Sequence, residues 1–345
     1  MSGPVDDGPG GGMAPGTIGA PGTTGAPGTT GPTGGDRTTA SAGNGGPGTN
    51  ATGTIYDIGY RGYEGPRLGR PQAIRTLTAH TLRGAYGIGR GGRSKVVPFG
   101  LLVLLLIPAI VSLGLSGLIG PAGETFDPIR YESYYSITQT VLFLFIAAQA
   151  PELVGPDQRN RVLPLYFSRP ILRSDYAFSK LLALFLAIFL FTIAPQALLF
   201  VGKVLQAPDF ATGLSNNLPV VLPIIGTAFA ISLLFAALGL AISAFTPRRA
   251  YATAVIIGVF IASNAIAGIL YAVLRGEARR FVALISVDTI LTGLASFLFS
   301  TPTSEIPSPI VRRADLPGIV YVLATLLVVA VATGLLFRRY HTVEA

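Results

Sequence analysis

The sequence lacks several residue types on which enzyme chemistry depends. It contains no cysteine, no tryptophan and only two histidines, His80 and His341, among 345 residues. Without cysteine there is no disulfide, no zinc–thiolate centre and no thiol nucleophile, and two histidines argue against a histidine metal site or triad. Charged residues make up only 12% of the chain, against about 25% in typical soluble domains. These absences argue against a soluble globular enzyme.

Long apolar runs take the place of charge. Half of the residues are hydrophobic and the mean hydropathy is +0.57. A helix that crosses a bilayer needs about 20 mostly apolar residues. Six runs meet this length, at 97–119, 135–154, 177–202, 218–246, 250–274 and 316–337. The sequence therefore predicts an all-α, polytopic membrane protein with six transmembrane helices.

A further apolar segment, 281–300, is long enough to span but carries a polar stripe. Asp288, Thr292, Ser296 and Ser300 recur at every fourth position, so they share one face of a helix. An acidic side chain at the centre of a bilayer is costly. We expect an amphipathic or re-entrant segment here and not a seventh span.

Two segments precede the first span. Residues 1–53 are rich in Gly, Pro and Thr, with a short collagen-like glycine period, and we predict a disordered, low-complexity tail. This tail has no apolar core of the kind found in a secretory signal peptide, so the first span is expected to direct insertion. In residues 54–96, Pro71 can open a basic amphipathic helix over 71–86, which we expect to lie along the membrane surface.

The Lys and Arg residues are distributed unevenly between the predicted loops. With six spans and both termini in the cytoplasm, most of the 25 Lys and Arg residues fall on the cytoplasmic side, as the positive-inside rule requires. This bias accounts for the net charge of +8 without nucleic acid as a partner. Membrane lipid is the expected neighbour of the basic segments.

The densest charge cluster lies between the second and third predicted spans, in residues 151–176. Acidic and basic residues occur together there around the apolar residues Leu163, Leu165, Tyr166 and Phe167. Mixed charge around an apolar patch is typical of a docking surface for a soluble partner, although the apolar residues could equally lie among lipid headgroups. The sequence leaves both readings open.

The spans themselves carry almost no ionisable residue, which argues against an ion-coupled carrier. Their polar candidates for lining a transport path are Gln139, Gln149, Gln196 and Asn264, which could instead form hydrogen bonds between helices. Residues 87–94, GIGRGGRS, imitate a phosphate-binding loop, but Arg93 replaces the required lysine and no strand precedes them. We expect no ATPase site in this chain and no catalytic site.

Three stretches resemble the permease subunits of bacterial ABC transporters of the type 2 exporter class. They are residues 55–70 (IYDIGYRGYEGPRLGR), residues 95–99 (KVVPF), and the segment from Pro151-Glu152-Leu153 through Leu163-Pro164-Leu165-Tyr166 and Ser168-Arg169-Pro170 to Lys180. The resemblance covers residues 54–340. It implies six spans over 97–340 in the bacterial plasma membrane, a connecting helix at 71–86 and short re-entrant helices at 281–300.

The resemblance also implies partners and a coupling site. Two permease subunits, identical or paralogous, would pair, and two separate ATPase subunits that hold ATP and Mg²⁺ would dock from the cytoplasm; this chain would bind no cofactor or metal. A coupling helix within 151–176 would transmit ATPase closure to the spans. The candidate coupling residues are Glu152, Gly155, Asp157, Arg159, Arg161, Leu163, Pro164, Leu165, Tyr166 and Arg169. The alternatives are a membrane anchor that recruits a partner without transport and an ion-coupled secondary transporter.

Overall fold

A computed structural model describes residues 65, 69–119, 128–168, 171–246 and 248–342. The chain divides into two units, Met1–Tyr63 and Glu64–Ala345, and the described residues all belong to the second. The predicted tail 1–53 and most of the segment ahead of the connecting helix lie outside the described residues, as does Arg169.

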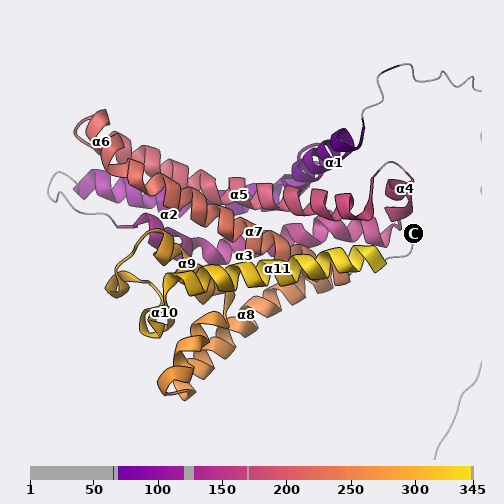
Figure 1. Cartoon of the computed structure of the whole chain (residues 1–345). Coiled ribbons are helices and arrows are strands. Elements are labelled where there is room, and N and C mark those ends of the chain that lie inside the picture. The colour runs from indigo at the N-terminus through magenta and orange to yellow at the C-terminus, as the bar shows by residue number, and fades with distance from the viewer. Residues whose placement is uncertain (1–64, 66–68, 120–127, 169–170, 247, 343–345) are drawn as a thin grey trace, which may run out of the picture. The chain divides into compact units, whose positions relative to one another are not determined.

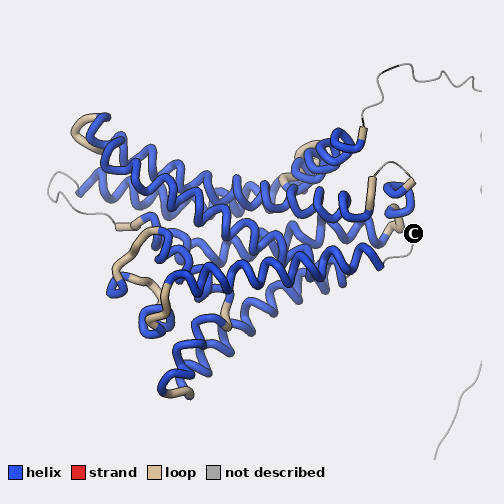
Figure 2. Tube along the Cα trace, in the orientation of Figure 1, coloured by secondary structure: helices blue, strands red, loops and turns tan. Residues whose placement is uncertain are grey.

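Helices and short loops account for all of the described structure, which contains no strand (Figure 2). In chain order the elements are α1 (Arg70–Ala85), α2 (Arg93–Ile119), α3 (Tyr131–Arg159), α4 (Leu163–Phe167), α5 (Arg173–Gln206), α6 (Phe210–Asn217), η2 (Leu218–Val220), α7 (Val221–Phe245), α8 (Arg249–Val273), η3 (Gly276–Leu284), α9 (Val287–Leu298), η4 (Thr303–Glu305), α10 (Pro309–Ala314) and α11 (Gly318–Thr342). Six of these helical segments are long and apolar enough to cross a membrane: α2, α3, α5, α6 with α7, α8 and α11. The predicted all-α, six-span fold is confirmed.

The second span extends further than predicted. Helix α3 passes through Pro151 and Pro156 and ends at Arg159, beyond the predicted end at residue 154. Pro151 cannot donate to the carbonyl of Ala147, and Thr253 Oγ1 of α8 donates to that carbonyl instead (2.8 Å). The expected loop 151–176 is therefore helical at both ends, and only 160–172 connects α3 to α5.

The inner helices of the bundle are α3, α5 and α7. The most apolar stretches of α3, of α5 and of α6 with α7 are buried within the chain to 61, 44 and 50%. Phe145, Phe191 and Phe235 are fully buried between them. Gly239 lets α7 approach α3 closely, because a Cβ at this position would lie 2.7 Å from Ile146 Cγ2. In contrast, α2, α8 and α11 are largely exposed, as expected of surfaces that face lipid or another subunit.

The shorter helices gather at two ends of the bundle. Figure 1 shows α1, α4 and the end of α11 at one end, here called the α4 end, and α6, α9 and α10 at the other, here called the α9 end. Segment 281–300 is not one helix, because η3 and α9 meet at 89°. Of its polar stripe, Thr292 and Ser296 are buried and border a small cavity against α3 and α7.

Candidate functional site

Helix α4 is a five-residue turn of helix at the α4 end, set between the second and third spans. Arg161 takes a left-handed conformation (φ 52°) that reverses the chain after α3, and Val162 N–H donates to Asp157 O (3.1 Å) across this reversal. Pro164 lies in the first turn of α4, where its missing N–H costs nothing. The sequence therefore builds a short, sharply turned element.

One face of α4 is packed against the start of α5. Leu163 is buried, and the rings of Tyr166 and Phe167 pack on Tyr176, with centroid separations of 5.6 and 6.4 Å. Burial, and after it the charge of Asp157, raises the pKa of the Tyr166 hydroxyl, so this hydroxyl stays neutral. The opposite face carries Leu165, which is 68% exposed. Helix α4 is thus anchored on one side and open on the other.

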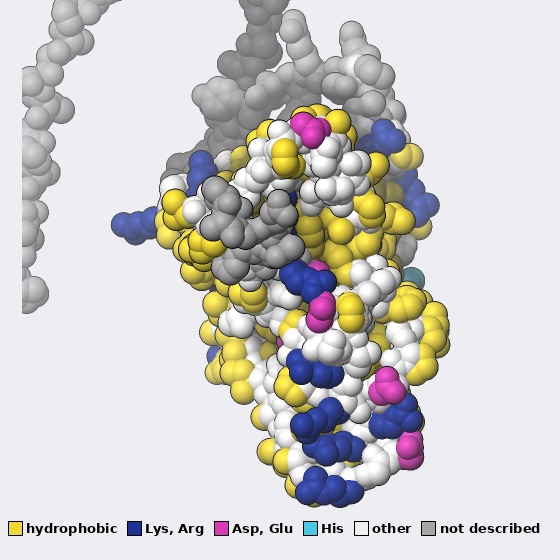
Figure 3. Space-filling model, turned by 90° about the vertical axis from the view of Figure 1, so that its left-hand side faces the viewer, with side chains coloured by type: hydrophobic (Ala, Val, Ile, Leu, Met, Phe, Trp, Pro, Cys, Tyr) yellow, Lys and Arg dark blue, Asp and Glu magenta, His cyan; other side chains and the backbone are white. Residues whose placement is uncertain are grey.

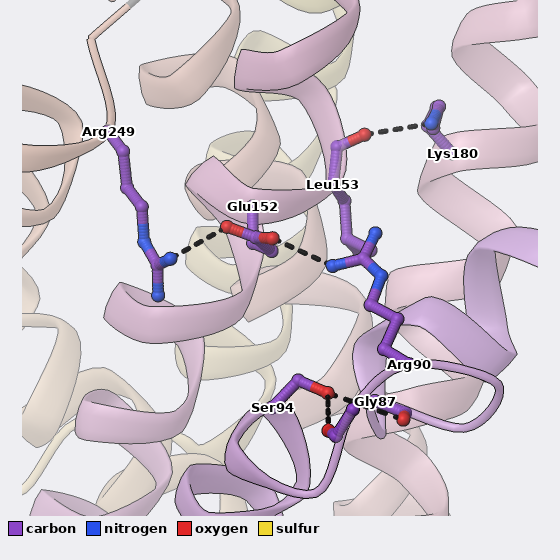
Figure 4. Close-up of polar contacts among 8 residues, drawn as sticks. Gly87, Arg90, Ser94, Glu152, Leu153, Lys180 and Arg249 are labelled. Atoms are coloured by element: carbon purple, nitrogen blue, oxygen red, sulfur yellow. Dashed lines mark hydrogen bonds and ion pairs between the residues drawn. The ribbon is translucent and has the colours of Figure 1, made fainter. Parts of the chain in front are cut away.

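Beneath α4 lies a buried polar cluster that joins α3 to α5. The Tyr176 hydroxyl donates to Asp157 Oδ2 (2.7 Å), and Lys180 Nζ lies 2.8 Å from the same oxygen. Lys180 also donates to Leu153 O (2.8 Å; Figure 4). The position of Lys180 at the start of the third span suggests a side chain that extends to the membrane surface. Lys180 is only 6% exposed, however, so its side chain stays inside the protein.

Two further contacts extend this cluster to α7 and α11. Gln158 Nε2 donates to Ala244 O (3.1 Å) and to the Tyr340 hydroxyl (3.3 Å). The Tyr340 ring also packs on Tyr176, with centroids 5.1 Å apart. Helix α4 therefore rests on a block of side chains from three spans, which a hydrogen bond to the Ala244 carbonyl joins to α7.

Glu152 forms a second junction, near the surface. One carboxylate oxygen accepts from Arg90 (2.7 Å) and the other pairs with Arg249 (2.8 Å), as Figure 4 shows. Arg90 belongs to the turn after α1 and Arg249 begins α8. One acidic residue of α3 thus ties the connecting segment to the fifth span.

The glycine-rich residues 87–94 form the compact turn that carries Arg90. Gly87 has φ 66°, and a Cβ there would lie 2.6 Å from Ser94 O, so no larger residue fits without displacement. Ser94 Oγ donates to Gly91 O (2.7 Å), and Figure 4 shows Ser94 closing back on Gly87. No strand leads into this turn, which supports a structural role for its glycines and not phosphate binding.

Helix α1 is fixed to α5 at its beginning and just past its end. Arg70 makes two hydrogen bonds to the Asp175 carboxylate (2.7 and 2.6 Å), and Asp175 Oδ2 also accepts from Leu172 N–H at the start of α5 (3.0 Å). The hydrogen bond to Asp175 raises the pKa of the Arg70 guanidinium above its ordinary value. Past the other end, the Tyr86 hydroxyl donates to Ala187 O (2.7 Å). A cleft of about 340 Å³ remains between α1, α3, α4 and α5.

The predicted coupling residues divide into two groups. Glu152, Gly155, Asp157 and Leu163 are engaged within the chain, and Tyr166 is half-buried. Arg159, Arg161, Pro164 and Leu165 are exposed at the α4 end. Sequence reasoning missed Arg70, Arg90, Gln158, Arg249 and Tyr340 as members of the site. The available signal was that acidic and basic residues occur near the same membrane boundary. The sequence does not show which acidic residue contacts which basic residue.

The predicted path residues also differ in their contacts. Gln196 donates to Tyr131 O (3.1 Å), and Asn264 accepts from Ser286 (2.6 Å), so both join elements of the chain. Gln139 and Gln149 are buried, and Gln139 borders the small cavity beside Thr292 and Ser296. Among the described residues no cluster of His, Asp and Glu could hold a metal ion.

The comparison with known families identifies this bundle. The family model described as ABC-2 family transporter protein matches residues 92–265, about half of the chain, from the start of α2 into α8. No curated protein matches the sequence. Because this match covers half of the chain and six helices are long and apolar enough to span a membrane, the chain belongs to the ABC-2 transporter family and is a multi-pass membrane permease of an ABC transporter.

Proposed function

We propose that this permease serves an ATP-driven exporter and that α4 is the element on which a separate ATPase subunit docks. The observation that carries the proposal is the double character of α4. Its buried face rests on side chains of three spans, Tyr176, Tyr340 and Gln158, while Leu165 on the other face is exposed. An element that is fixed inside and open outside can pass a partner's motion to the bundle.

The exposed side of α4 has the chemistry of a docking surface. Arg159 and Arg161 flank the turn into α4, and neither has an acidic partner in the described part of the chain. Leu165 offers an apolar contact between charged residues, which is the usual arrangement of an interface core and its rim. An ATPase groove with carboxylates around an apolar floor would match this surface in charge and shape.

Transmission follows from packing. ATP and Mg²⁺ would bind to the ATPase pair, whose closure displaces α4. Because the interior is close-packed, the displacement carries Tyr176 and the helices attached to it as a body. Asp157 and Gln158 then move the end of α3 together with α5, α7 and α11. The bundle shifts toward outward opening, so ATP binding selects the releasing state.

The membrane arrangement completes the proposal. The α4 end carries Arg159, Arg161, Arg338 and Arg339, which favours the cytoplasmic side of the plasma membrane. Both ends of the chain then lie in the cytoplasm. The largely exposed faces of α2, α8 and α11 would contact lipid and a second permease subunit, identical or paralogous. A path between subunits would need no ionisable residue.

The test reverses the charge of the docking surface. Arg159→Glu combined with Arg161→Glu should abolish co-purification with the cognate ATPase and ATP-dependent uptake into inverted vesicles, which is how export is measured there. Arg338→Glu is the matched control, since this arginine is also exposed at the α4 end but lies away from α4 in the sequence. Undiminished association and export in the double variant would refute the docking site. Retained association in the unaltered protein without any transport would favour the anchor function instead.

A further inference from the structure

A second cluster of charge lies at the α9 end, opposite the proposed ATPase site. Five arginines occur in and beside η3 and α10: Arg275, Arg279, Arg280, Arg312 and Arg313. Figure 3 faces this end and shows Lys and Arg side chains gathered over its lower part, with acidic side chains beside some of them. In the proposed orientation this is the outer side, where basic residues are not favoured by the positive-inside rule.

Two of the five arginines are explained by the fold. Arg280 donates to Ala314 O (2.9 Å) and Asp315 O (2.8 Å) and pairs with Glu277 (3.1 Å), which fixes the end of α10 on η3. Arg312 donates twice to Ile306 O (2.7 and 3.2 Å). These contacts hold α10 in place beside the end of α8. Of the other three arginines, Arg275 is exposed beside η3, and Arg279 and Arg313 remain to be explained.

Arg279 and Arg313 converge on one tyrosine. The Arg279 guanidinium carbon lies 3.9 Å from the centre of the Tyr271 ring. Arg313 donates to the hydroxyl of the same tyrosine (3.1 Å). Neither arginine has a carboxylate partner in the described part of the chain, and Arg279 Nε is buried there without an acceptor. Tyr271 therefore gathers two positive charges at a single point, with an N–H donor still unused.

Two neighbouring guanidinium groups without a counterion repel one another, so the arrangement favours a bound anion. The planar guanidinium presents paired donors that match phosphate oxygens. Tyrosine near the end of a span is typical of the headgroup layer, and Tyr271 lies close to the end of α8 at Val273. The neighbouring surface is apolar, with Ile269 63% and Val273 68% exposed, which suits acyl chains.

We propose that Tyr271, Arg279 and Arg313 bind the phosphate group of an anionic phospholipid in the leaflet at the α9 end. The lipid's chains would lie along the exposed face of α8. A free phosphate ion carries the same phosphate group but would make no contact with that apolar face. The site therefore favours a lipid over a free phosphate ion. This inference is independent of ATPase docking, because it concerns the opposite end of the bundle.

The experiment measures lipid adducts of the detergent-purified chain by native mass spectrometry, with phosphatidylglycerol and phosphatidylcholine compared at equal concentration. We expect phosphatidylglycerol to bind preferentially, and Arg279→Gln with Arg313→Gln to weaken that binding about tenfold to hundredfold, as for loss of a hydrogen bond to a charged group. Tyr271→Phe, which keeps the ring under Arg279 and removes the acceptor that holds Arg313, should weaken it by a smaller factor. Arg338→Gln at the other end is the control and should bind like the unaltered protein.

Three outcomes would overturn the inference. One is equal binding of the two lipids, and another is an equal loss in Arg338→Gln. The third is competition by inorganic phosphate at the concentration at which phosphatidylglycerol binds, since this would make the site one for a soluble anion. If Arg279→Gln disturbs folding, Arg313→Gln alone still decides the matter, because Arg313 is exposed and its loss leaves the contacts of Arg280 intact.

Discussion

Removal of the Asp157 carboxylate should weaken the block beneath α4 more than any other single polar change at this site. Asp157→Asn removes the negative charge beside the buried Lys180, which keeps its hydrogen bond to Leu153 O. The substitution also replaces the charged acceptor of the Tyr176 hydroxyl by a neutral one. Loss of one partner of a buried ion pair costs about 3–5 kcal/mol. The Asp157 side chain is 17% exposed, so we expect a value near the lower end, about 3 kcal/mol.

The assay is equilibrium unfolding of the purified permease in mixed micelles, followed by circular dichroism. The control pairs Asp157→Asn with Lys180→Met, which removes both charges and keeps an unbranched side chain of similar length. The double variant should regain much of the lost stability, because the uncompensated ammonium is gone. A loss below about 1 kcal/mol in the single variant, or equal losses in single and double variants, would refute the reasoning.

Three further changes test the geometry around the site. Gly87→Ala should destabilise the turn that carries Arg90 by about 1–3 kcal/mol, because φ is 66° and the added Cβ would lie 2.6 Å from Ser94 O; a neutral result in micelle unfolding would contradict this packing. Gly239→Val should cost about 1–3 kcal/mol by overpacking α7 on Ile146, whereas Gly258→Val, with open space around it, should unfold at the same denaturant concentration as the unaltered protein. Glu152→Gln should cost only about 1 kcal/mol, because its pairs are partly exposed, and the loss should shrink as salt is added; an effect independent of salt would argue against an electrostatic origin.

The spans were predictable because the bilayer demands long apolar helices, and that demand leaves a strong pattern in the sequence. The extension of α3 was not predictable. Pro151 and Pro156 suggest a break, and only the contact of Thr253 with the carbonyl that Pro151 frees shows how the helix continues. The polar stripe of 281–300 predicts an amphipathic or re-entrant segment, and in the structure the segment is divided between η3 and α9. Its 89° bend depends on tertiary packing that no local pattern encodes.

The sequence predicts where the candidate site lies but not which of its residues contact one another. A charge cluster between two apolar runs marks a membrane boundary, and that much is local information. The sequence does not show that Asp157 belongs to Lys180, or that Tyr340 near the end of the chain packs on Tyr176. These pairings arise because α3 and α11 end, and α5 begins, at the α4 end of the bundle (Figure 1). Charged residues that the sequence places in a surface loop, such as Asp157, therefore form contacts that hold the helices together.

The central claim is that the exposed face of α4 contacts an ATPase, and the absence of cysteine from the chain allows one direct measurement. Leu165→Cys, at an exposed position, would be treated with a short thiol-reactive crosslinker in membranes that contain the cognate ATPase. Leu205→Cys, equally exposed but toward the α9 end, is the control. We predict a permease–ATPase adduct from Leu165→Cys alone. The same adduct yield from both variants, or none from Leu165→Cys while the ATPase still co-purifies, would contradict the account.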